Sequence, residues 1–82
     1  MKGQEINDHM EAIEAHWELG DSISADSHIH AIFICLSDIT DHMIDKLKKS
    51  LEESLESLET ESPCWWSASQ FLREVNRESD SR

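Results

Sequence analysis

Acidic residues and a histidine recur at helical spacing near the middle of the chain. The residues at positions i, i+3, i+4 and i+7 are Asp38, Asp41, His42 and Asp45. On one helix this spacing aligns carboxylates with an imidazole, a ligand set that a divalent cation could use. A solvated acidic stripe has the same spacing, and neither HExxH nor CxxC occurs in the chain. We therefore predict no metal site and no cofactor.

The two cysteines do not lie in a pattern that predicts nucleophilic chemistry. Cys35 falls within the apolar run 31–36, and Cys64 directly precedes two tryptophans. A cysteine nucleophile needs a neighbouring base and a lowered pKa. The chain also has no glycine-rich phosphate loop and no GxSxG motif. The sequence predicts a protein that is not an enzyme.

All five histidines lie in the more acidic part of the chain. Residues 1–45 hold one lysine and ten acidic residues (net charge −9), whereas residues 46–82 hold six basic and eight acidic residues (net charge −2). Protonating every histidine would change the total charge from −11 to −6. Histidine titrates near physiological pH, so His28, His30 and His42 are candidates for an acid response. The alternative is that they titrate at the surface without consequence.

The net charge of −11 restricts the partners of this protein. It disfavours direct binding to nucleic acid phosphates or anionic membranes, which attract lysine and arginine, and it favours a basic protein partner. Adjacent tryptophans on a helix point about 100° apart, so a small core can hardly bury both, and aromatic anchors are frequent at interfaces. The alternative is that one covers the core and the other is half-exposed. The residues that we expect to face a partner are Trp65, Trp66, Glu11, Glu14, Glu18, Asp38, Asp41 and Asp45.

The spacing of apolar residues predicts an all-α fold, because no sustained strand alternation competes with it. We expect a first helix over about 7–19, ended by Gly20 in the left-handed conformation. A second helix should begin at Ser24 as its N-cap and continue to about Glu61. A third should begin with Ser62 as N-cap and Pro63 at its first position.

These elements predict one helical domain over residues 1–77, built as a hairpin or small bundle of two to three helices, with 78–82 as a frayed tail. A helix over 24–61 would be about 50 Å long. It would have to bend or break near 48–50, or be covered by a second chain, so we predict a homodimer. The residues expected in the core or dimer seam are Ile13, Trp17, Ile29, Ile32, Phe33, Leu36 and Met43.

The sequence also indicates a location. Its opening residues contain no apolar stretch typical of a secretory signal, and the apolar run 31–36 is far shorter than the roughly 20 residues of a membrane span. Two cysteines without a disulfide-like pattern are typical of reducing compartments. We expect a cytoplasmic protein with no membrane partner.

Part of the chain resembles the AriR-like small regulators of biofilm development and acid resistance in enterobacteria, connector proteins of the Rcs phosphorelay. The resemblance covers about residues 12–53. The residues that carry it are Ala12, Ile13, Trp17, Gly20, Asp21, Ile23, Ile29, Ile32, Phe33, Leu36 and Asp41. They follow the family's pattern of a short helix, a Gly-Asp turn and a long second helix. The resemblance implies a helical homodimer that regulates by protein contact, with an association with DNA, and no catalytic residues.

Together these observations predict a small acidic regulator that acts through protein–protein contact, as a connector or modulator of a signalling or transcription factor, with a response to acid or other stress. The alternative is an acidic inhibitor that mimics nucleic acid and blocks a DNA- or RNA-binding protein, as in phage anti-defence. That alternative requires a continuous track of carboxylates on one surface.

Overall fold

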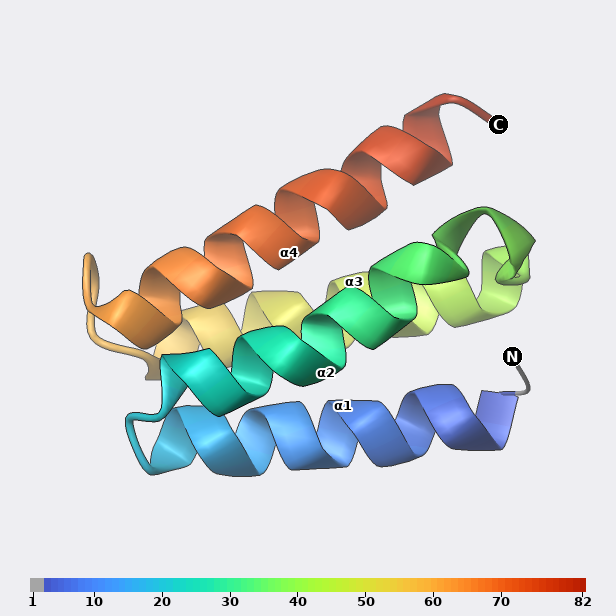
Figure 1. The fold of residues 1–82 in the computed structure, drawn as a ribbon. Coiled ribbons are helices and arrows are strands. Elements are labelled where there is room, and N and C mark those ends of the chain that lie inside the picture. Colours follow the sequence, from blue (N-terminus) through green and yellow to red (C-terminus); the bar gives the residue numbers. More distant parts are fainter. Residues whose placement is uncertain (1–2) are drawn as a thin grey trace.

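The computed structural model describes residues 3–82, and helices account for most of that range. The elements are α1 (Gly3–Glu18), α2 (Ser22–Ile34), the 3-10 helix η1 (Leu36–Asp38), α3 (Asp41–Ser57) and α4 (Pro63–Asp80). Helices α1 and α2 form one hairpin, α3 and α4 form a second, and η1 connects the two (Figure 1). The predicted all-α class is confirmed, but with four α-helices in the described residues instead of two or three.

The first hairpin turns at Gly20, as predicted. Gly20 has a φ of +76°, the left-handed conformation that a residue without a Cβ adopts at little cost. The N-cap of α2 is Asp21 and not Ser24: the Asp21 carboxylate accepts a hydrogen bond from the backbone N–H of Ser24 at 3.0 Å. The hydrogen bond holds the pKa of the Asp21 carboxyl below its ordinary value. The aspartate therefore starts the second helix three residues earlier than the serine would.

The predicted helix over 24–61 is wrong in its continuity, because the chain breaks between Ile34 and Asp41. The break lies at 35–40 and not near 48–50. Thr40 has extended backbone angles, and its hydroxyl accepts a hydrogen bond from the Met43 N–H at 3.3 Å. This cap starts a new helix, so the rod of about 50 Å does not form and the two hairpins fold onto each other.

The second hairpin ends in an ordered C-terminus. The Ser62 hydroxyl caps α4 by accepting from the Trp65 N–H, with Pro63 at the first turn as predicted. The tail expected to fray at 78–82 is instead helical to Asp80. Arg82 donates to the carboxylates of Asp41 (2.6 Å) and Glu78 (3.1 Å), and these bonds raise the pKa of its guanidinium. Residue 1, where the predicted domain begins, lies outside the described residues.

The core fills the space between the two hairpins. The predicted seam residues that are buried in it are Ile13, Trp17, Ile29, Ile32, Leu36 and Met43. Phe33 is half-buried and packs edge-to-face on Phe71 of α4, with ring centroids 5.5 Å apart. Among the described residues no polar or charged side chain is buried. One chain therefore buries by itself the seam residues that a second copy was expected to cover.

None of the helices in residues 3–82 combines the length and the apolar character needed to cross a membrane.

The break at Thr40 gives a stability prediction. We expect Thr40→Ala to destabilise the fold by about 1 kcal/mol, because the Met43 N–H loses its cap. That loss corresponds to a fall in Tm of about 4–8 °C for a domain of this size, measured by thermal unfolding. Thr60→Ala, in the loop between α3 and α4, is the matched control. An equal fall in both variants would contradict a specific role for the cap.

Candidate functional site

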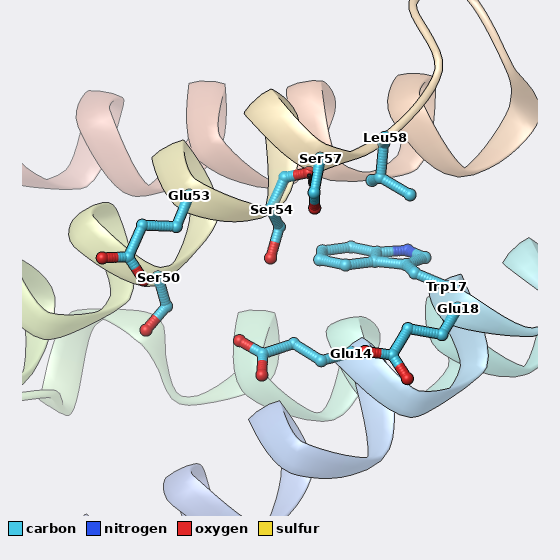
Figure 2. Close-up of a pocket in the computed structure, with 8 residues that line it drawn as sticks. All are labelled: Glu14, Trp17, Glu18, Ser50, Glu53, Ser54, Ser57 and Leu58. Carbon is cyan, nitrogen blue, oxygen red and sulfur yellow. Dashed lines mark hydrogen bonds between the residues drawn. The ribbon is translucent and has the colours of Figure 1, made fainter.

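A groove between α1 and α3 is lined mainly by carboxylates and hydroxyls. Its cavity of about 220 Å³ has the Trp17 indole as its floor (Figure 2). Glu14 and Glu18 project from α1 on one side of the ring, and Glu53 projects from α3 beside Ser50. The remaining lining residues are Ser54, Ser57 and Leu58. No lysine or arginine of residues 3–82 lines this part of the groove.

The charge in the groove acts on Glu14. Partial burial raises the pKa of the Glu14 carboxyl above its ordinary value, and the negative charges of Glu18, Glu53 and Glu11 raise it further. Removing water and adding like charges both disfavour the ionised form. Glu11 and Glu18 are neighbours of Glu14 on α1, whereas Glu53 comes to the groove from α3. A cation entering the groove would reduce the repulsion among these charges.

The groove continues along α1 towards its N-terminal end. A neighbouring hollow shares Glu14 and Ser50 and adds Asp8 and Glu11, with Lys46 of α3 as its one basic lining residue. Three of the predicted interface residues, Glu11, Glu14 and Glu18, thus lie along one groove. Glu53 completes it, and the sequence alone did not single out this residue, because only the fold places α3 beside α1.

A chain of hydrogen bonds fixes the floor of the groove. The Trp17 Nε1–H donates to the Ser67 hydroxyl of α4 at 3.2 Å, and that hydroxyl donates to the Asp26 carboxylate of α2 at 2.6 Å. Trp17 is only 4% exposed. The indole is therefore bonded directly to α4 and, through the Ser67 hydroxyl, connected to α2.

The other predicted interface acids do not join this groove. Asp38 is in η1, on the other side of the chain break from Asp41 and Asp45, so these residues do not share one helical face as expected. Asp41 pairs with Arg82. Asp45 lines a surface of mixed charge with Lys46 and other residues of α3.

The paired tryptophans are displayed at the start of α4. Trp65 is half-buried and Trp66 is 53% exposed, and their rings meet edge-to-face with centroids 4.9 Å apart. Trp66 lines a second groove, between α2 and α4. The tryptophans and the acidic groove therefore belong to different surfaces of the protein.

Three histidines meet where α1 packs on α2. His9 and His28 share a hydrogen bond between their Nδ1 atoms at 3.0 Å, and the His16 ring stacks on His28 with centroids 5.6 Å apart. His16 also lies 3.9 Å from the Asp21 carboxylate. Of the predicted acid-responsive residues only His28 belongs to this cluster, whereas His30 lines the α2–α4 groove and His42 lies on α3.

Two further groups bear on the chemistry of the molecule. Burial, with Asp21 and Asp26 nearby, raises the pKa of the buried Cys64 thiol, which keeps it protonated and weakly nucleophilic. The Cys35 thiol donates to backbone carbonyls of its own helix. Within residues 3–82 no three His, Cys, Asp or Glu side chains are grouped so as to hold a metal ion.

Comparison of the chain with known protein families, with curated proteins and with solved structures finds no match.

The electrostatics of Glu14 give a pH-dependent prediction. Because its pKa is raised in the folded state, its ionisation opposes folding. This penalty is absent below the ordinary pKa of 4.5 and complete above the raised one. We expect Glu14→Gln to raise Tm at neutral pH by about 2–4 °C, the effect of removing about 0.5 kcal/mol of like-charge repulsion. The gain should disappear as the pH falls through 4.5.

Glu52→Gln is the control for Glu14→Gln. Glu52 lies among lysines on α3, so its neutralisation should leave Tm unchanged or lower it slightly. A gain of equal size in both variants would show that net charge, and not the groove, sets the effect.

Proposed function

We propose that this chain is a small, acidic, non-enzymatic regulator that binds a basic segment of another protein in the groove between α1 and α3. The observation that carries the proposal is that Glu14, Glu18 and Glu53 line one groove, without a lysine or arginine of residues 3–82 among its lining residues. A lysine or arginine side chain would neutralise this charge.

The electrostatics of Glu14 support this choice. Partial burial raises the pKa of its carboxyl, and the negative charges of Glu18, Glu53 and Glu11 raise it further. A cation that binds here replaces like-charge repulsion by attraction. Part of the free energy of binding therefore comes from charges that the fold has already placed in the groove.

The regulatory part of the proposal rests on features outside the groove. The resemblance to connector regulators points to a partner in a signalling or transcription pathway. An acid response of His28, His30 and His42 stays a prediction of the sequence. The buried Cys64 thiol, whose pKa is raised, gives no support to covalent catalysis. We place the protein in the cytoplasm, where such a thiol stays reduced.

The alternative of nucleic acid mimicry stays a prediction of the sequence. It needs a continuous track of carboxylates, and the lysines of α3 interrupt the acids there. The groove is a local site that a single basic segment fits better.

The homodimer also stays a prediction. Its first reason, a helix too long for one chain to cover, no longer holds because of the break at 35–40. Leu19 and Ile23, exposed beside the first hairpin turn, are apolar side chains available for self-association.

Neutralising the groove tests the proposed function. We expect the triple variant Glu14→Gln, Glu18→Gln, Glu53→Gln to weaken binding of a fluorescent lysine- and arginine-rich peptide by about tenfold, with a smaller dependence on salt. Fluorescence anisotropy gives the affinity. In the wild type the peptide should also shift the NMR signal of the Trp17 indole N–H.

The matched control removes the same number of carboxylates from outside the groove, as Glu52→Gln, Glu56→Gln, Glu59→Gln. It should change the affinity by less than about twofold. Equal weakening by both triple variants would mean that the peptide responds to net charge, and the groove would then have no specific function.

A further inference from the structure

A second groove, of about 410 Å³, lies between α2 and α4. It has an aromatic and apolar floor that includes Phe33, Phe71 and Trp66. Trp66 is 53% exposed, whereas Phe71 is buried beneath it in the core. An aromatic side chain that is half-exposed at the edge of such a hollow is typical of an interface anchor.

Helix α2 carries apolar side chains on more than its buried face. Ala25, Ile29 and Ile32 are buried, whereas Ile23 and Ile34, near its two ends, are 81% and 75% exposed. The exposed residues between them are polar, namely Asp26, Ser27 and His30. The apolar side chains that α2 contributes to the groove are Ile29 and Phe33.

The groove is preformed by contacts at both edges. The Ser67 hydroxyl of α4 donates to the Asp26 carboxylate of α2 at 2.6 Å, and Phe33 meets Phe71 edge-to-face at 5.5 Å. These contacts set the separation of the two helices without filling the hollow between them. Binding of a ligand would therefore cost little conformational entropy, because the groove is already ordered.

The charges around the groove indicate the kind of partner. Asp26 and Glu74 line it together with His30, and no lysine or arginine in the described part of the chain does so. Glu74 has only a loose pair with the exposed Arg77, at 3.6 Å, which contributes little. An apolar floor with carboxylates at its edges is complementary to a helix that carries aliphatic side chains on one face and lysine or arginine beside them.

We propose that the α2–α4 groove binds an amphipathic basic helix of a partner protein, with Trp66 as the central anchor. The groove is separate from the acidic one between α1 and α3, so the proposal goes beyond the function assigned above and does not depend on it. A second copy of this chain fits less well, because each copy has a net charge of −11.

The experiment uses a short synthetic amphipathic helix with leucines on one face and lysines on the other. In NMR titration with the full chain it should shift the indole signal of Trp66 and the backbone amide of His30. Trp66→Ala should weaken binding by about tenfold or more. Gln70→Lys, a change of charge at an exposed residue of the groove, should also weaken it without touching the core.

The controls separate this groove from the acidic one and from self-association. Leu19→Ala removes an exposed apolar side chain outside the groove and should leave the affinity unchanged. A shift of the Trp17 signal with Trp66 unmoved would assign the peptide to the acidic groove and overturn the proposal. Equal binding of a leucine–glutamate helix would also overturn the proposal. So would a doubled mass in light scattering before any peptide is added, if Trp66 is covered in that dimer.

Discussion

The position of the Trp17 indole is the constraint on which both grooves depend. The ring is buried, forms the floor of the acidic groove, and donates through the Ser67 hydroxyl to the Asp26 carboxylate at the edge of the apolar groove. These hydrogen bonds therefore link α1 to α4 and α4 to α2, in addition to the direct packing of α1 on α2. A buried indole N–H without an acceptor would be costly. The Ser67 hydroxyl supplies that acceptor, and Ser67 and Asp26 also line the apolar groove.

The second constraint is the length of helix whose apolar side a chain of 82 residues can cover. Leucine and isoleucine continue at helical spacing across the break at 35–40, so periodicity predicts a single long helix there. Only the cap at Thr40 marks the new start, and a local capping signal is weak against an unbroken apolar stripe. By contrast, Gly20 and the Ser62-Pro63 pair were predictable because each stands where the stripe ends. The position of the break depends on how the two hairpins pack against each other, which a local pattern does not show.

The candidate site, like the fold, could be predicted from the sequence only in part. The spacing of Glu11, Glu14 and Glu18 could be read from one helix, whereas Glu53 joins them only because α3 packs beside α1. The histidine cluster carried a signal that was missed. His9 and His16 are two turns apart on one helix, and a hairpin that turns at Gly20 places residue 28 opposite the stretch between them. The frayed-tail expectation failed for a related reason, since Arg82 finds its partner Asp41 only in the folded chain.

Acid acts on the groove between α1 and α3 through Glu14. Partial burial and the negative charges of neighbouring carboxylates raise the pKa of Glu14, so acid neutralises it and removes a penalty on folding. A groove with fewer carboxylates would attract the proposed basic segment less strongly. Stability and the proposed binding therefore respond to acid in opposite directions, because neutralising Glu14 favours the fold and weakens the attraction for a cation.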